Sequence, residues 1–225
     1  TILFYDGVQW AAMNSWVKDY LYGIWGSPSG NIYPVGSSGT ILRFDGANWT
    51  LMSSWTGNYL CGLWGTDDSQ VFVVGDFGTI LHYNGAMWSP MSRGTTNYLY
   101  GVWGTGPDNV FTVGDFGTIL HYDGSRWNYM NSGVAGFLSG VWGSSGTNVY
   151  TVGFQGTILH YNGSSWTNRA GPTSQHLNGI WGSSATDIFA VGDGGTILHY
   201  NGQSWTVIDS GIHKDLFGIW GSYPA

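Results

Sequence analysis

Residues 177–205 read LNGIWGSSATDIFAVGDGGTILHYNGQSW, and this stretch decides the fold. It contains short apolar runs separated by the polar turn 183–186, the Asp193-Gly194-Gly195 turn and the Asn201-Gly202 pair. Runs rich in β-branched and aromatic residues, bounded by Gly, Asn and Asp, predict antiparallel strands joined by tight turns. We name the four expected strands A (177–182), B (187–192), C (196–200) and D (from 205).

The same pattern recurs every 39 residues along the whole chain without an insertion or deletion. One tryptophan opens each strand D and another lies in each strand A: Trp10, Trp49, Trp88, Trp127, Trp166 and Trp205, and Trp25, Trp64, Trp103, Trp142, Trp181 and Trp220. A strict period of this length indicates one supersecondary unit copied in tandem, and a four-stranded meander of this size is a propeller blade. We therefore predict an all-β fold, a β-propeller of 39-residue four-stranded blades, as a single domain over residues 1–225.

The number of blades does not follow directly from the number of repeats. The strand A and strand C patterns each occur six times, whereas strand B occurs five times. The chain opens on strand C and stops just after a sixth strand A, at residues 218–221. We favour six blades, with a composite last blade closed by both termini, its strand B missing or supplied by residues 222–225. A five-bladed ring with redundant ends is one alternative; a ring completed by another chain, a homo-oligomer through the incomplete blade, is another.

Composition excludes several classes of function. The net charge is −7 with only six Lys and Arg, which argues against nucleic acid and against an anionic membrane surface. No apolar run is long enough to span a bilayer, so we expect no membrane insertion. The chain has no Glu, and no nucleophile or carboxylate pair breaks the repeat, so we expect no enzyme, no catalytic residues and no cofactor. Low charge, many Trp, Tyr, Asn and Gly, and a first residue other than Met favour a secreted, extracellular binding protein.

The twelve periodic tryptophans recur in every unit, so we expect all of them to be core residues that fill the wedges between blades.

Two tryptophans stand outside the periodic set. Trp16 and Trp55 occupy equivalent positions in the connection from strand D to the next strand A. The other units have Gly94, Gly133, Pro172 and Gly211 there. No packing rule requires an indole at a position that tolerates glycine, so we expect both to be exposed. An exposed indole is a stacking platform for the apolar face of a pyranose, and contact between subunits is the alternative.

Two further sets of polar residues recur. Asp76, Asp115 and Asp193 lie in the turn between strands B and C, and they either cap that turn or accept hydrogen bonds from sugar hydroxyls. His82, His121, His160 and His199 share one position in strand C, where other units have Phe4 and Arg43. Phe and Arg as replacements favour a packing position whose ring edge meets a hydrogen-bond partner. Ligand contact stays an alternative, and no metal site is expected.

The chain also resembles known repeat families. The segment from Gly192 to Trp205 resembles the bacterial BNR or Asp-box type of propeller repeat. The residues Asp187-Ile188-Phe189, Asn201-Gly202 and Trp205 are similar to the blade pattern of bacterial lectins related to the Photorhabdus lectin. Val141-Trp142-Gly143 with Asn148-Val149-Tyr150 resembles tectonin repeats. The resemblance implies a propeller that binds sugars.

These observations together predict a non-enzymatic carbohydrate-binding protein, a lectin with glycans as partners and multiple weak sites between its blades. Repetition favours this function because weak contacts gain from multivalent display. The alternative is a structural or protein-interaction propeller module of a secreted or surface assembly.

Overall fold

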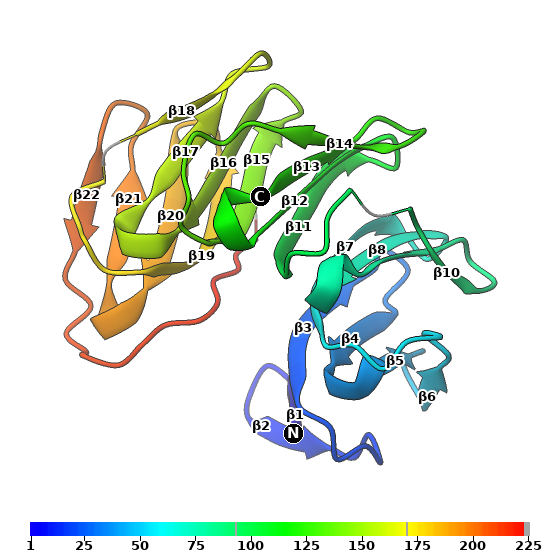
Figure 1. The fold of residues 1–225 in the computed structure, drawn as a ribbon. Helices are drawn as coiled ribbons and strands as arrows, with labels where there is room; N and C mark the ends of the chain where they lie inside the picture. The colour runs from blue at the N-terminus through cyan, green and yellow to red at the C-terminus, as the bar shows by residue number, and fades with distance from the viewer. Residues whose placement is uncertain (93, 170, 223–225) are drawn as a thin grey trace.

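The computed structural model describes residues 1–92, 94–169 and 171–222. Within these residues the chain forms five four-stranded antiparallel sheets and one two-stranded sheet, arranged along an arc (Figure 1). We call the four-stranded sheets blades 1 to 5. The fold is an all-β propeller of 39-residue four-stranded blades, as predicted.

The strands follow the expected order in each blade. Blade 1 contains β3 (Leu21–Gly26), β4 (Ile32–Gly36), β5 (Ile41–Phe44) and β6 (Trp49–Met52). Blade 2 contains β7 (Leu60–Asp67), β8 (Gln70–Gly75), β9 (Ile80–Tyr83) and β10 (Trp88–Pro90). Blade 3 contains β11 (Leu99–Gly106), β12 (Asn109–Gly114), β13 (Ile119–Tyr122) and β14 (Trp127–Met130). Blade 4 contains β15 (Leu138–Ser145), β16 (Asn148–Gly153), β17 (Ile158–Tyr161) and β18 (Trp166–Asn168). Blade 5 contains β19 (Leu177–Ser184), β20 (Asp187–Gly192), β21 (Ile197–Tyr200) and β22 (Trp205–Ile208).

Turn chemistry sets the register within each blade. The second and third strands are joined by short 3-10 turns: η1 (Ser37–Gly39), η2 (Asp76–Gly78), η3 (Asp115–Gly117), η4 (Phe154–Gly156) and η5 (Asp193–Gly195). The third and fourth strands are joined by the Asn-Gly or Asp-Gly hairpins. In blade 2, Gly85 has a φ of 89°, which favours glycine, and Asn84 Oδ1 accepts hydrogen bonds from the backbone N–H of Ala86 and Met87.

Each blade buries its apolar side chains against the next blade. The first strands of consecutive blades lie against one another along the inner side of the arc, and the fourth strands lie at the outer edge. Between blades 3 and 4, for example, Phe111 and Val113 pack with Leu138 and Trp166. Because both faces of a sheet are covered, the third strands carry nearly continuous apolar sequence.

The composite unit is present in two parts. At the N-terminus, β1 (Ile2–Tyr5) and β2 (Trp10–Met13) pair as the third and fourth strands of a blade. Residues 216–221 lie beside β19, where Leu216 N donates to Gly192 O and Gly221 lies against the ring of Trp181. Within the described residues no strand pairing joins these two parts. The expected strand B falls partly on residues 223–225, outside the described residues.

The tryptophans show what the composite unit leaves uncovered. Trp88 is only 2% exposed because blade 1 covers it, as expected for a core residue. Trp10 and Trp220, in the two parts of the composite unit, are 68% and 83% exposed. The expectation that all twelve periodic tryptophans are buried is therefore wrong at both ends, since the covering side chains belong to a neighbouring blade.

Pro34 interrupts blade 1 as its residue type requires. In the pairing of β4 with β5 only Ile32 with Phe44 and Val35 with Ile41 are in register, and the proline position is skipped. Proline has no N–H to donate to the neighbouring strand. Among the described residues, no helix is long and apolar enough to cross a membrane.

Candidate functional site

The predicted site residues lie at two different ends of the blades. The turn between the second and third strands lies beside two connections: Asp76 N donates to Tyr59 O in the connection that enters its own blade, and Gly39 N donates to Asn58 O in the connection that enters the next blade. We call this end the connection face and the opposite end, with the Asn-Gly and Asp-Gly turns, the hairpin face. Trp16, Trp55 and the aspartates belong to the connection face, whereas the histidines lie toward the hairpin face.

Trp16 and Trp55 are exposed, as predicted, and their backbone is unusual. Their side chains are 84% and 78% exposed, and both residues have a φ of 60°. At the equivalent positions Gly133 and Gly211 have φ of 72° and 68°, so this turn is left-handed in four units, whereas blade 4 has Pro172 there. A side chain in this conformation costs about 1–2 kcal/mol. The chain therefore holds two indoles in solvent at positions where the fold favours glycine.

Trp55 forms part of the wall of two pockets. The larger, of about 550 Å³, lies toward the preceding connection and is lined by Asp19, Thr40 and Ser54 among others. The smaller, of about 170 Å³, is lined by Asn58 and Thr79 among others. Thr40 Oγ1 donates to Asp19 Oδ2 at 2.9 Å, and Asn58 Nδ2 donates to Thr79 Oγ1 at 2.8 Å. The indole is thus flanked by hydroxyl, amide and carboxylate groups that hold fixed positions.

In the described part of the chain, the carboxylates of Asp76, Asp115 and Asp193 lie beside side chains of strand A and form no hydrogen bond with the backbone of their own turns. Each carboxylate faces the residue at the β-bulge near the start of strand A in its own blade. Tyr100 Oη donates to Asp115 Oδ1 at 2.9 Å, and Asn178 Nδ2 donates to Asp193 Oδ1 at 2.9 Å. The bulge turns that side chain toward the carboxylate.

In blade 2 the bulge residue is Cys61, whose Sγ lies 4.0 Å from Asp76 Oδ1. Burial, with a smaller contribution from the charge of Asp115, raises the pKa of Asp76. Burial and then the Asp76 charge raise the pKa of the Cys61 thiol to about 11. The thiol therefore stays protonated at neutral pH.

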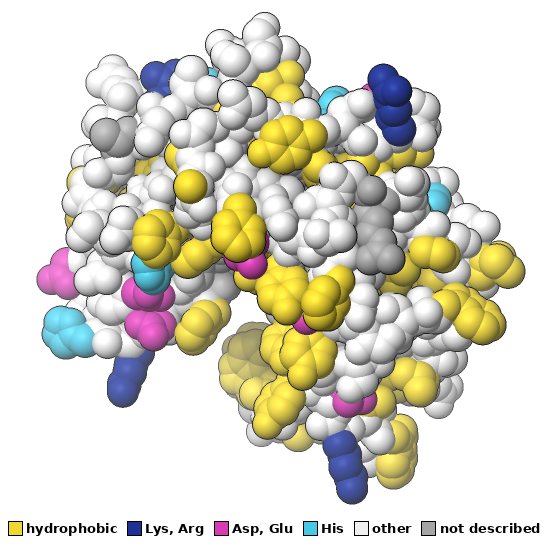
Figure 2. Space-filling model, in the orientation of Figure 1, with side chains coloured by type: hydrophobic (Ala, Val, Ile, Leu, Met, Phe, Trp, Pro, Cys, Tyr) yellow, Lys and Arg dark blue, Asp and Glu magenta, His cyan; other side chains and the backbone are white. Residues whose placement is uncertain are grey.

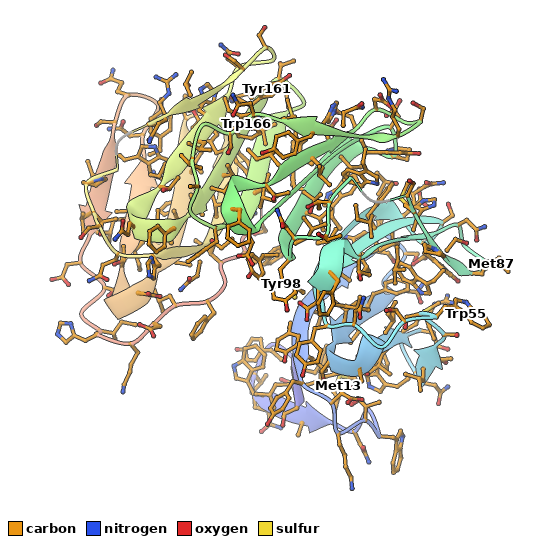
Figure 3. The ribbon with its side chains drawn as sticks, in the orientation of Figure 1. Met13, Trp55, Met87, Tyr98, Tyr161 and Trp166 are labelled. Atoms are coloured by element: carbon orange, nitrogen blue, oxygen red, sulfur yellow. The ribbon has the colours of Figure 1, made fainter. Side chains whose placement is uncertain are left out.

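Sequence reasoning missed a row of aromatic side chains on the same face. Figure 2 shows hydrophobic side chains following the inner margin of the arc, with acidic side chains between them. We call Tyr59, Phe77, Tyr98, Phe116, Phe137 and Phe154 the inner aromatic row. Two pairs of members touch: the Phe77 and Tyr98 ring centroids are 5.4 Å apart, and those of Phe137 and Phe154 are 5.5 Å apart. Figure 3 shows Tyr98 at the inner margin and Trp55 at the outer edge, so the row is separate from the Trp55 pockets. Its signal in the sequence is an aromatic residue directly before most A strands.

The four histidines are packing residues with a hydrogen bond, as predicted. Each stacks on the aromatic residue of the second strand; the centroids of His121 and Phe111, for example, are 4.4 Å apart. Each Nε2 also lies 2.6–2.9 Å from a side-chain oxygen at the start of that strand: His82 with Gln70, His121 with Asn109, His160 with Asn148 and His199 with Asp187. Burial lowers the pKa of His82, His121 and His160. Their role as ligand contacts, like that of the aspartates, stays a prediction.

Comparison with known proteins extends the fold assignment. No family model matches the chain, and no curated protein matches it. Among solved structures, virginiamycin B lyase from Staphylococcus aureus has a TM-score of 0.76 at 15% identity, with 84% of this chain and 69% of that chain covered. YCF48 from Cyanidioschyzon merolae has a TM-score of 0.66 at 19% identity, with 87% and 74% covered. A structure titled YCF48 bound to D1 peptide has a TM-score of 0.50 at 13% identity, with 84% and 80% covered.

These neighbours are β-propeller proteins, and at such identities the likeness concerns the fold alone. The finer resemblance to Asp-box repeats, tectonin repeats and the Photorhabdus type of lectin stays a prediction.

Proposed function

We propose that the protein is a secreted, non-enzymatic lectin whose principal sugar sites are built on Trp16 and Trp55. One observation carries the proposal: both indoles are exposed and left-handed at positions where equivalent units have glycine. A residue in a strained backbone conformation destabilises the fold, and such residues cluster at positions that bind ligands. A solvent-facing indole contributes nothing to the core, so we infer that these tryptophans are kept because they bind a ligand.

The surroundings of Trp55 suit a pyranose. The apolar C–H face of the sugar would stack on the indole, and its hydroxyls would meet the polar groups on either side. Asp19 and Thr40 line one pocket, while Asn58 and Thr79 line the other. Each site alone offers little enclosure, so we expect weak single-site affinity. Repeated sites on one face gain affinity for glycans that reach more than one of them.

The test is a glycan array followed by calorimetry with the best ligand. The variants are Trp16→Ala, Trp55→Ala and the double variant. Tyr129→Ala, an exposed aromatic of β14, is the matched control. We expect each single variant to weaken binding to a multivalent glycan at least tenfold, the double variant to abolish it, and the control to leave it unchanged. Binding to no glycan, or unchanged binding by the double variant, would reject the proposal.

A second candidate function rests on the inner aromatic row. Contiguous exposed aromatic side chains mark protein-binding surfaces. A propeller of similar fold is described as bound to a peptide, and a polypeptide is the class of ligand that we infer for this row. With Asp76 and Asp115 beside it, the row suits a polypeptide with apolar and basic residues.

Phe77→Ala with Phe116→Ala separates the two candidates, because this pair leaves Trp16 and Trp55 intact. If the row is the main site, the pair abolishes binding of a partner polypeptide and the tryptophan variants do not. If the pair leaves all polypeptide binding unchanged, the second candidate is rejected.

A further inference from the structure

One residue of blade 4, the exposed Arg169, breaks the repeat at a position that is partly buried in most other units. Strand D ends at a methionine in the first four units, Met13, Met52, Met91 and Met130, and at Ile208 in the last, but blade 4 has Arg169. Met52, Met91 and Met130 pack against the cores between blades. The backbone is the same in blade 4, since Arg169 N donates to Ile158 O at 2.8 Å just as Met91 N donates to Ile80 O at 2.9 Å. A cation therefore replaces an apolar side chain facing the next blade.

The same groove contains a tyrosine of strand B. This position has phenylalanine in blades 2, 3 and 5 and tyrosine in blades 1 and 4, Tyr33 and Tyr150. Tyr150 lies against Tyr200 of blade 5, with ring centroids 5.9 Å apart. Burial first, and then the neighbouring Tyr200, raise the pKa of Tyr150 to about 12, so its hydroxyl keeps its proton. Arg169 and Tyr150 therefore both place polar groups in this groove.

A cavity lies beside Arg169. It has a volume of about 340 Å³ and lies between blades 4 and 5, lined by Tyr150, His160, Arg169, Tyr200, Gln203, Ser204 and Trp205. This volume is at the lower end of the range for small-molecule sites.

The hydrogen bonds orient the cation. Asn148 Nδ2 donates to Ser144 Oγ at 2.8 Å, so Asn148 Oδ1 accepts from His160 Nε2 at 2.6 Å. His160 Nδ1 is then an acceptor, and Arg169 Nη2 donates to it at 3.2 Å. A neutral imidazole thus holds the guanidinium in place. Among the described residues, no carboxylate forms a salt bridge with Arg169.

We propose that this groove binds the carboxylate of a small acidic sugar of the uronic acid class. A guanidinium binds a carboxylate through two parallel N–H···O bonds, a geometry that neither methionine nor lysine provides. The hydroxyls of Tyr150, Tyr200 and Ser204 line the remaining wall, which suits the hydroxyls of a pyranose better than an apolar acid. The site is distinct from Trp16 and Trp55, and it does not depend on them.

The test measures binding of methyl glucuronide, with methyl glucoside as the uncharged analogue and sulfate as a plain anion. Arg169→Met restores the residue that four other units have at this place, and Tyr150→Phe gives strand B the phenylalanine of blades 2, 3 and 5. Arg126→Met, which removes an exposed arginine of blade 3, is the matched control.

We expect the wild type to bind methyl glucuronide at least tenfold more tightly than methyl glucoside. Arg169→Met should lose this preference, Tyr150→Phe should weaken binding several-fold, and Arg126→Met should leave it unchanged. Circular dichroism checks that Arg169→Met is folded. The Trp16→Ala, Trp55→Ala double variant should still bind methyl glucuronide, which separates this proposal from the lectin sites. Equal binding of glucuronide and glucoside, unchanged binding by Arg169→Met, or sulfate binding as tight as glucuronide would each overturn it.

Discussion

Replacing Trp55 with glycine should give a more stable protein than replacing it with alanine. Trp55 has a φ of 60°, and the side chain of any L-residue except glycine costs about 1–2 kcal/mol in this conformation. Glycine removes that cost, but its more flexible unfolded chain subtracts about 0.4–1 kcal/mol. The net expectation is that Trp55→Gly exceeds Trp55→Ala by about 0.5–1 kcal/mol in the free energy of unfolding. Both variants lack the indole, so its own contacts cancel in the comparison.

The assay is equilibrium urea unfolding followed by circular dichroism, with the midpoint and slope fitted for each variant. Lys18→Gly and Lys18→Ala form the matched control pair, because Lys18 is exposed in the neighbouring connection and has no positive φ. At Lys18 the order reverses, and glycine is the less stable by about 0.4–1 kcal/mol. If Trp55→Ala is as stable as Trp55→Gly, Trp55 has no backbone strain, and the main argument that its indole is kept for ligand binding fails.

Three further outcomes follow from the structure. Burial lowers the pKa of His121, so as pH falls through about 6.5 the unfolded chain binds a proton before the folded one and the free energy of unfolding decreases. His121→Phe should therefore reduce the decrease in the midpoint urea concentration between pH 7 and pH 5. Because the pKa of Asp76 is raised, ionisation of this carboxyl group lowers the stability of the folded protein as pH rises above the usual pKa of an aspartate. Asp76→Asn should therefore raise the melting temperature at pH 7 but not at pH 3. Gly114→Ala would place Cβ 1.9 Å from Tyr98 O, so it should lower the free energy of unfolding by about 3 kcal/mol or more in the same urea assay. Gly57→Ala, whose Cβ would have no atom within 4 Å, should be neutral or slightly stabilising.

Predictions from the sequence were most accurate where the physics is local. The strand order of each blade follows from alternating apolar runs and turn residues, and pairs such as Asn201-Gly202 mark the hairpins by their tolerance of positive φ. The exposure of Trp16 and Trp55 was also predictable, because glycine at the equivalent positions shows that no packing role is required there.

The partners of the site residues could not be predicted in the same way. Asp115 receives a hydrogen bond from Tyr100 only because a β-bulge turns the tyrosine toward it, and a bulge has no clear signature in a strand pattern. The inner aromatic row combines residues that precede first strands, Tyr59, Tyr98 and Phe137, with residues of the 3-10 turns, Phe77, Phe116 and Phe154. The contact of Phe77 with Tyr98 joins two blades, so it depends on how consecutive blades are placed along the arc.

The sequence by itself determined the repeating unit, its four strands and its turns, because these depend on residue types a few positions apart. Only the tertiary structure decided which faces meet across neighbouring blades, and so where a cavity opens beside Arg169. It also decided that Trp10 and Trp220 lie exposed while their equivalents are covered. The physical reason is that burial between blades depends on side chains about 39 residues apart, whose contact is set by the twist and stacking of whole sheets.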